Sequence, residues 1–495
     1  GVFAFFPQLL NVFGCTLELE PYAKDYGYII VLGLPFMMVC TTINSIIRAD
    51  GNPRYAMISM LINALYNIVD SIFVAQYSQS ALAAVSLVFP LQQLVIAIGV
   101  GTGVGVNSLI SRRLGEKRQL HADSAAEHGI ALAVIGGLAF VVVGFVLAPP
   151  FLGAFGSAPD VYEQAVQYSQ VAVGMSFFVM ISMMCEKIQQ STGNMIIPMC
   201  QGLTGAIINI ILDPLMIFGI GPFPEMGVYG AAAATVIGQV FGMLIGLWGV
   251  FIHQKVLRIK MREFKWRLQT VKDIYRVGLP GIVMQSVVSV MTAGMNAILI
   301  SFSQTAVNVL AVYFKLQTFV FMPVFGLNQG ALPVMGYNYG ARNKGRLFGA
   351  YKIALTAAVV IMGLGLVVFQ AIPETMLMMF VDRTDAAAAR EMLEVGVPAL
   401  RIISLSFIGA AFGIINSTLF QATARGLNSL IVSVCRQLVI ILPAAWLLGR
   451  WFGLGAIWYS FPIAEIAAFF ISYALLWKEY RTELRFLGIE KEGKA

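Results

Sequence analysis

The residues with the clearest capacity for chemistry are Asn209, Asp213 and Pro214, which lie in one apolar stretch, GAIINIILDPLMIFG. A carboxylate within a membrane span is costly unless it is paired, protonated or solvated. Asn209 precedes Asp213 by one helical turn, so both side chains lie on the same face. Pro214 lacks an N–H, which frees the carbonyl of Ile210 and favours a bend in the helix. These oxygens predict a site for a hard cation or for a proton. The alternative is a neutral Asp213 that caps local backbone groups.

A second polar set lies in the stretch ISMLINALYNIVDSIFVAQ, where Asn63, Asn67 and Asp70 recur at helical spacing. Such a stripe on an apolar helix is expected to face the interior of a bundle or water. A seam of hydrogen bonds between helices is the alternative. Thr235 lies in a run of small residues, where hydrogen bonding to the backbone at a tight helix contact is one interpretation.

The composition requires a membrane around these residues. The chain has 495 residues, of which 58% are hydrophobic and only 12% charged, and its mean hydropathy is +0.80. A soluble domain carries about 25% charged residues. Apolar runs of about 20 residues are long enough to cross a bilayer as helices. Twelve such runs follow Met57, and one more precedes them at about 28–47. Their approximate limits are 57–76, 82–111, 127–151, 161–188, 197–220, 228–252, 277–301, 306–337, 348–371, 395–421, 428–448 and 454–477.

The net charge of +7 is carried by short connections between these runs. The clusters of Lys and Arg follow even-numbered runs, at residues 112–118, 255–276, 342–346 and 478–494. By the positive-inside rule this side is cytoplasmic, and so is the C-terminus. A basic patch on a soluble domain, typical of nucleic-acid binding, is not predicted. Five scattered cysteines and three histidines give no pattern for a disulfide frame or a structural metal. The sequence also contains no catalytic motif or phosphate loop, so an enzyme is not predicted.

The sequence contains an internal repeat with an offset of 225 positions. Phe89 and Gln92 match Phe314 and Gln317, and further matches fall at glycines. Two halves of six helices in the same orientation imply a pseudo-two-fold axis along the membrane normal. We therefore predict an all-α polytopic membrane protein made of two six-helix bundles. A generic helical bundle is the alternative.

One extra N-terminal helix stands outside this plan. Residues 1–56 match the region of the fourth run at an offset of 142; Gly51-Asn52, for example, meets Gly193-Asn194. We interpret them as a truncated or recombined partial copy. Since the chain begins with Gly1 and no signal peptide precedes the first run, we also expect it to be incomplete or processed at its start. The predicted organisation is 1–56, the partial copy; 57–254, the N-terminal half; 255–276, a cytoplasmic linker; 277–478, the C-terminal half; and 479–495, a cytoplasmic tail.

The two polar stretches, the segment GPFPEMGVYGAAAATVIGQ, the segment FMPVFGLNQGALPVMGYNYGARNKGR and SVCRQLVIILP together resemble the multidrug and toxic compound extrusion (MATE) family, in its prokaryotic form. The resemblance covers most of residues 57–478. It implies export of bulky, often cationic organic compounds in exchange for Na⁺ or H⁺. It also implies that Asp70, Asn209, Asp213 and Thr235 surround one cation site. In the second half, Met295 stands where the repeat places Asp70, and Leu442-Pro443 stands for Asp213-Pro214. We therefore expect one coupling site, in the first half.

A polyspecific substrate cavity favours adaptable side chains, and methionine is flexible and polarisable. The candidates for its lining are Asn63, Asn67, Glu186, Met284, Gln285, Met291 and Met295. Glu186 has two alternatives: it pairs with Lys187, or it lies at the inner membrane interface. In the second half, Glu465 and Arg401 lie at membrane depth, where an ion pair is one interpretation, and Arg436 is expected to extend to the inner surface.

The predicted protein is thus a secondary active antiporter that works by alternating access. We expect a monomer in the inner (plasma) membrane, in contact with membrane lipids and small organic substrates, with no nucleic-acid partner. No cofactor is expected besides the coupling ion. The alternatives are a lipid-linked oligosaccharide flippase of related architecture, or a non-transporting membrane sensor or scaffold.

Overall fold

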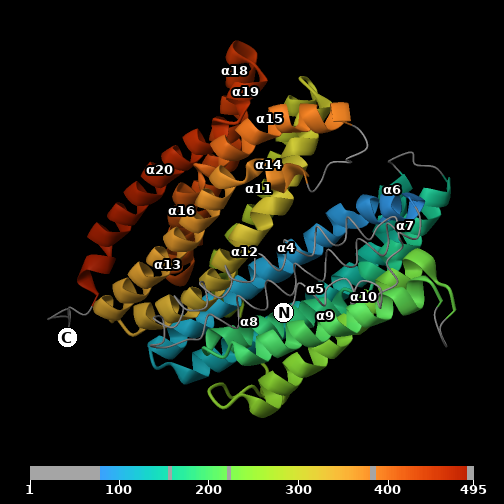
Figure 1. The fold of residues 1–495 in the computed structure, drawn as a ribbon. Coiled ribbons are helices and arrows are strands. Elements are labelled where there is room, and N and C mark those ends of the chain that lie inside the picture. Colours follow the sequence, from blue (N-terminus) through green and yellow to red (C-terminus); the bar gives the residue numbers. More distant parts are fainter. Residues whose placement is uncertain (1–78, 154–158, 220–223, 379–385, 488–495) are drawn as a thin grey trace, which may run out of the picture.

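A computed structural model describes residues 79–153, 159–219, 224–378 and 386–487, all of them helical or irregular, with no strand in those ranges (Figure 1). The run at 57–76, the N-terminal partial copy and its extra helix lie outside the described residues. So do three of the predicted site residues, Asn63, Asn67 and Asp70.

The first half of the described chain forms one helical lobe, which we call the N-lobe. Its elements are α4 (Gln79–Gly115), α5 (Gln119–Val142), the π-helix η2 (Val143–Leu147), α6 (Ala148–Gly153), α7 (Pro159–Ala172), α8 (Phe177–Ser191), α9 (Ile196–Ile217), α10 (Gly227–Trp248) and the π-helix η3 (Gly249–His253). A short 3-10 turn, η4 (Met261–Glu263), lies in the connection that follows.

The second half forms the C-lobe. Its elements are α11 (Leu268–Ile300), α12 (Gln304–Gly340), α13 (Lys344–Ala371), α14 (Pro373–Met378), α15 (Ala386–Ser404), α16 (Phe407–Ala422), α17 (Gly426–Val434), the π-helix η5 (Cys435–Ile441), α18 (Leu442–Phe452), α19 (Leu454–Ile457), α20 (Ser460–Thr482) and the 3-10 turn η6 (Leu484–Phe486). Helix α11 begins at Leu268, so the last part of the segment predicted as a linker is helical.

The predicted spans are confirmed where the structure describes the chain. Nine helices in those ranges are long and apolar enough to cross a membrane, and two further pairs qualify as bent spans, which makes eleven. These eleven correspond to the second to twelfth predicted runs. The protein is therefore a multi-pass membrane protein.

The internal repeat is visible in the elements themselves. The last residue of α12, Gly340, lies 225 positions after the last residue of α4, Gly115, the offset found in the sequence. The fourth and tenth spans are the two that bend, by 43° between α7 and α8 and by 46° between α15 and α16. The largest buried cluster belongs to the C-lobe, and two smaller ones lie mainly in the N-lobe. The prediction of two related bundles is thereby confirmed.

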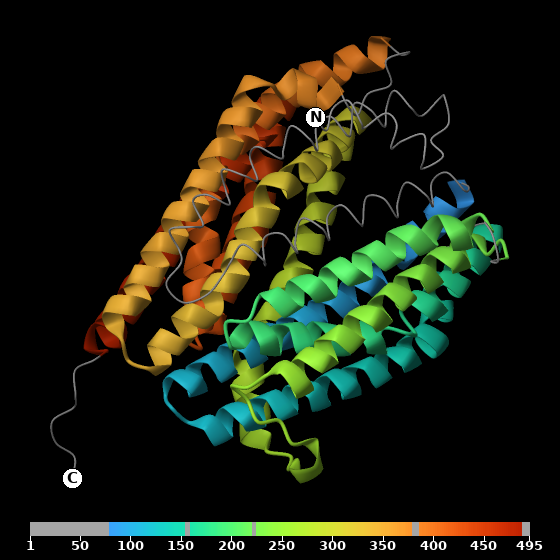
Figure 2. The same ribbon diagram turned by 60° about the horizontal axis from the view of Figure 1, so that its bottom comes forward.

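The two lobes contact each other at the end of the molecule where α4 and α12 terminate, and in both views their helices diverge from that end (Figures 1 and 2). A Cβ added to Gly115 would lie 2.0 Å from the carbonyl oxygen of Tyr337, and one on Gly340 would lie 2.1 Å from that of Arg112. The α4 and α12 backbones touch here, which only glycine permits. Gly101 packs in the same way against Ile282 of α11, as close helix packing predicts.

The basic connections gather at this same end. Arg113 Nη2 lies 3.2 Å from Asp273 Oδ2 at the start of α11. The side-chain amide of Gln119 donates to the carbonyl of Val256, and Lys344 Nζ lies 3.4 Å from the Tyr480 hydroxyl. Four basic segments that are far apart in the sequence therefore lie at one end of the bundle, which we call the basic end.

Candidate functional site

Helices α9 and α10 approach unusually closely, and this positions the predicted cation site. A Cβ on Gly238 of α10 would lie 2.6 Å from the carbonyl oxygen of Gly205 of α9. Nearer the other end of the pair, a Cβ on Gly230 would lie 2.5 Å from the carbonyl oxygen of Met216. With no side chains between the backbones, polar groups on the facing turns come within hydrogen-bonding distance.

Three of the four predicted site residues meet at this contact. Asn209 Nδ2 donates to Asp213 Oδ1 at 3.1 Å and to Thr235 Oγ1 at 3.1 Å. The exposed fractions are 2% for Asn209, 0% for Asp213 and 9% for Thr235. The sequence placed Asn209 and Asp213 on one helix face, and the structure adds Thr235 from the neighbouring helix.

Asn209 Oδ1 is buried and accepts no hydrogen bond from any part of the chain that the structure describes. Leaving a buried acceptor unsatisfied is costly, so its presence calls for an explanation such as an ion. The groups available are a carboxylate, an amide oxygen and a hydroxyl, all of them oxygen ligands that suit a hard cation. The residues present therefore fit Na⁺ or a bound proton.

Pro214 lies inside α9, which continues through it to Ile217 as one α-helix. The backbone N–H of Phe218, one residue beyond this end, donates to the carbonyl of Pro214. Helix α9 is therefore continuous at Pro214 in this conformation, and the bend predicted there stays a prediction.

Glu186 and Lys187 form a cluster that reaches from the N-lobe to the C-lobe. Lys187 Nζ lies 3.1 Å from Glu186 Oε1, so the two neighbours pair. The same ammonium donates to Gln329 Oε1 of α12 at 2.6 Å. Gln190 Nε2 bonds both Glu186 Oε1 and Gln329 Oε1, at 2.7 and 2.8 Å. The glutamines were missed in the sequence, although a glutamine inside an apolar run is the same signal that singled out Asn209.

The predicted cavity residues of α11 lie in different surroundings. Met291 and Met295 are buried in the apolar core of the C-lobe, at 6% and 0% exposure. Met284 is half-buried and Gln285 is exposed. Of these four residues, only Met284 and Gln285 have side chains that are not buried.

In the C-lobe, the buried carboxylate Glu465 pairs with Arg436, whose Nη1 lies 3.0 Å from Glu465 Oε1. The expectation that Arg436 extends to the inner surface is therefore wrong, and Arg401 is not the partner of Glu465. Arg401 is exposed. An ion pair within the lobe costs less than an arginine and a carboxylate buried separately.

Comparison with known proteins agrees with this architecture. The MatE family model matches residues 2–69, 56–215 and 280–447. The chain is 26% identical over 428 residues to the multidrug export protein MepA of Staphylococcus aureus (strain MRSA252), covering 85% of this chain and 91% of that protein. It is 25% identical over 424 residues to MepA of Staphylococcus haemolyticus (strain JCSC1435), with the same coverage.

Solved structures show the same fold. A multidrug resistance MATE family transporter in an outward-facing conformation superposes with a TM-score of 0.81 at 27% identity, covering 88% of this chain and 95% of that one. A transporter of the MOP superfamily from Pyrococcus furiosus gives the same values. Since the family model matches far more than half of the residues, in both lobes, this chain belongs to the MATE family of membrane transporters.

Proposed function

We propose that this chain exports bulky, often cationic organic compounds across the plasma membrane in exchange for Na⁺ or H⁺. The relatives named multidrug export proteins support the class of substrate. The buried cluster of Asn209, Asp213 and Thr235 is the observation that supports the coupling. The basic end faces the cytoplasm, by the positive-inside rule, and the transporter works as a monomer.

The coupling ion is bound by Asp213, Asn209 and Thr235, with Asp70 as a fourth ligand. In the structure the Asn209 amide donates to both partners through Nδ2. Rotating this amide by half a turn presents Oδ1 to the same space, since the two ends of an amide have the same shape. The cluster then offers only oxygens, which is the ligand set that Na⁺ requires.

A proton is accommodated differently. On a protonated Asp213, the carboxyl O–H becomes a donor. Asn209 Oδ1 is a buried acceptor, and rotation of the Asn209 amide turns it toward Asp213. Either ion neutralises the charge that Asp213 carries in the membrane. The neutral lobe then packs differently from the charged one, and the difference in ion affinity between the two packings drives the cycle.

The contacts between the lobes indicate which part must move. Gly115 and Gly340 touch the facing backbone, Ser108 Oγ donates to the Gln421 carbonyl at 2.6 Å, and Lys187 reaches Gln329. All of these lie at the basic end. Alternating access requires these contacts to separate when the cavity opens to the cytoplasm. Substrate binds between the lobes, with Gln285 and Met284 as the candidate contacts.

The substitution Asp213→Asn tests the coupling. It keeps the size of the side chain and removes the charge, so we expect folding to persist and gradient-driven export to fall to background. The measurement is efflux of a fluorescent cationic dye in proteoliposomes, with Na⁺ and pH gradients imposed in separate experiments. Whichever gradient drives the wild type identifies the ion.

Glu163→Gln is the matched control, because Glu163 is an exposed carboxylate of the same lobe. We expect it to transport like the wild type. If Asp213→Asn also transports like the wild type under both gradients, Asp213 is not part of the coupling. Wild-type protein that moves no dye under either gradient, while moving a lipid-linked sugar, would favour a flippase instead.

A further inference from the structure

The segment that joins the two lobes is bound along a helix of the N-lobe. We call residues 254–267 the strap. Gln119 Nε2 donates to the carbonyl of Val256 at 2.7 Å, and the backbone N–H of Arg258 donates to Asp123 Oδ1 at 3.0 Å. The backbone N–H of Lys260 donates to Glu127 Oε1 at 3.0 Å. The strap is therefore held by its backbone against the first turns of α5.

The register of these contacts follows from geometry. Four residues along an α-helix advance about 6 Å, and two residues of extended chain advance about 6.6 Å. Alternate strap residues can therefore pair with every fourth residue of α5, as 256, 258 and 260 do with 119, 123 and 127. The intervening side chain of Leu257 is buried in the N-lobe core. The side chains of Val256, Arg258 and Lys260 are exposed.

A histidine fixes the far end of the strap. His128 is fully buried, its Nδ1 lies 2.7 Å from the carbonyl of Ser124, and its Nε2 accepts from the backbone N–H of Arg267 at 2.7 Å. The rings of Phe264 and Trp266 lie 5.0 and 5.5 Å from the His128 ring. The strap is thus anchored at both ends and along its length.

This anchoring leaves a dense set of cations at the surface. The strap contains six Lys or Arg against one carboxylate, Glu263, and all six cations are exposed. Of the six, Lys260 alone has an ion pair in the described part of the chain, with Glu263 at 3.2 Å. Even when Asp123 and Glu127 of α5 are counted against them, three positive charges of the strap are uncompensated, within a chain whose total is +7.

Apolar side chains lie among these cations. Val256, Met261 and Trp266 are 47%, 37% and 48% exposed. Exposed apolar side chains, tryptophan above all, combined with Lys and Arg are typical of segments that lie in the interface between headgroups and acyl chains.

We propose that the strap is a binding surface for anionic phospholipid headgroups of the adjacent leaflet. The strap begins directly after η3 and ends directly before α11, both of which continue into membrane spans, so it cannot leave the membrane surface. Its nearest anions are therefore lipids rather than a soluble partner. Its charges are complementary to them, and each Lys or Arg near such a surface strengthens binding about fivefold. This inference rests on membrane insertion and not on the proposed coupling site.

The test is the thermal stability of the purified full-length chain in an uncharged detergent, because a ligand that binds the folded state raises the melting temperature. We expect added phosphatidylglycerol to raise it in a saturable way and phosphatidylcholine to leave it unchanged. The triple variant Arg258→Gln, Arg262→Gln, Lys265→Gln is expected to weaken the apparent affinity for phosphatidylglycerol at least tenfold. The triple variant Arg342→Gln, Arg346→Gln, Lys352→Gln removes the same amount of charge elsewhere. It is expected to keep most of the apparent affinity for phosphatidylglycerol.

Two further measurements use the wild-type protein alone. In 0.5 M NaCl the effect of phosphatidylglycerol on wild-type protein is expected to fall strongly, because exposed charges are screened. Inorganic phosphate is expected to have no effect. The proposal is overturned if phosphatidylcholine stabilises as well as phosphatidylglycerol, if salt has no influence, if phosphate alone is sufficient, or if both triple variants lose affinity equally.

Discussion

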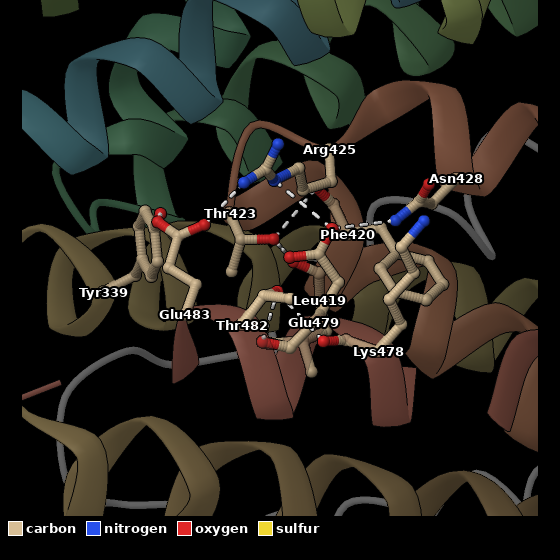
Figure 3. A network of polar contacts seen from close by, with 10 residues as sticks. All are labelled: Tyr339, Leu419, Phe420, Thr423, Arg425, Asn428, Lys478, Glu479, Thr482 and Glu483. Atoms are coloured by element: carbon tan, nitrogen blue, oxygen red, sulfur yellow. Dashed lines mark hydrogen bonds and ion pairs between the residues drawn. The ribbon is translucent and has the colours of Figure 1, made fainter. Parts of the chain in front are cut away.

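At the scale of single residues, a network of charged contacts surrounds Arg425, between α16 and α17 (Figure 3). Its Nη2 lies 2.6 Å from Glu483 Oε2, and its Nε lies 3.3 Å from Glu479 Oε1. The hydroxyl of Tyr339 donates to the other oxygen of Glu483. These contacts join the ends of α12, α16 and α20, and Glu483 lies one residue beyond the last span.

The protonation of Glu483 is tied to this network. Desolvation raises the pKa of Glu483, but the hydrogen bonds from Tyr339 and Arg425 outweigh it, and the pKa lies below the ordinary value of 4.5. The folded state therefore binds fewer protons than the unfolded state around that pH. The stabilisation is fully present above pH 4.5 and is lost as the pH falls through the lower folded-state pKa.

We therefore expect Glu483→Gln to lower the melting temperature in detergent by a constant amount from neutral pH down to about pH 5. Below that range the two curves are expected to converge, because the wild-type carboxyl becomes protonated as well. Glu374→Gln, at an exposed carboxylate, serves as the control and is expected to follow the wild type. A gap between Glu483→Gln and wild type that widens in acid would contradict the linkage.

At the scale of helices, the contact between α4 and α12 depends on two glycines. A Cβ on Gly340 would overlap the backbone carbonyl of Arg112, which cannot move without shifting α4. Gly349, in the next helix, has open space around its Cβ position. A Cβ therefore fits at Gly349 but not at Gly340, although both glycines lie in helices.

We expect Gly340→Ala to destabilise the protein by about 1–3 kcal/mol, the usual cost of overpacking. Gly349→Ala is expected to be neutral or stabilising by up to about 1 kcal/mol, since alanine favours a helix more than glycine does. Thermal denaturation of both variants in the same detergent is the measurement. Equal stability of the two variants would show that the lobes adjust freely at this contact.

Helix positions were predictable because each span must satisfy its own backbone in lipid, which requires a long apolar run. The interruptions were less predictable. The bends between α7 and α8 and between α15 and α16 were not predicted from the sequence, and neither were the π-helical turns such as η5. They depend on packing against neighbouring helices.

At the scale of the whole molecule, the strap determines how the lobes are connected. Because its backbone is bound to α5, the strap is part of the N-lobe, and α11, which follows it directly, is bound to α4 through Asp273 and Arg113.

His128→Ala tests this anchoring. The variant removes the acceptor of the Arg267 N–H and the ring against which Trp266 packs. We expect trypsin to cleave the strap about fivefold faster, which corresponds to the ~1 kcal/mol of one hydrogen bond. His121→Ala changes an exposed histidine of the same helix and is expected to be cleaved like the wild type. Unchanged cleavage of the His128 variant would mean that the contacts from the side chains at positions 119, 123 and 127 of α5 are enough to hold the strap in place.

The sequence by itself determined the number and order of the described spans, the two-lobe repeat and the clustering of cations at one end. It could do so because the bilayer imposes length, hydrophobicity and charge asymmetry on every helix separately. It also placed Asn209 and Asp213 on one helix face, since four residues make one turn.

Contacts between helices were decided only by the tertiary structure. It brought Thr235 to Asn209, paired Glu465 with Arg436 and linked Lys187 to Gln329. It also buried Met291 and Met295, which the sequence had offered as cavity residues. The physical reason is that a residue's partner across a helix interface depends on how closely two backbones approach and how each helix is rotated. Both are set by the packing of all the helices together.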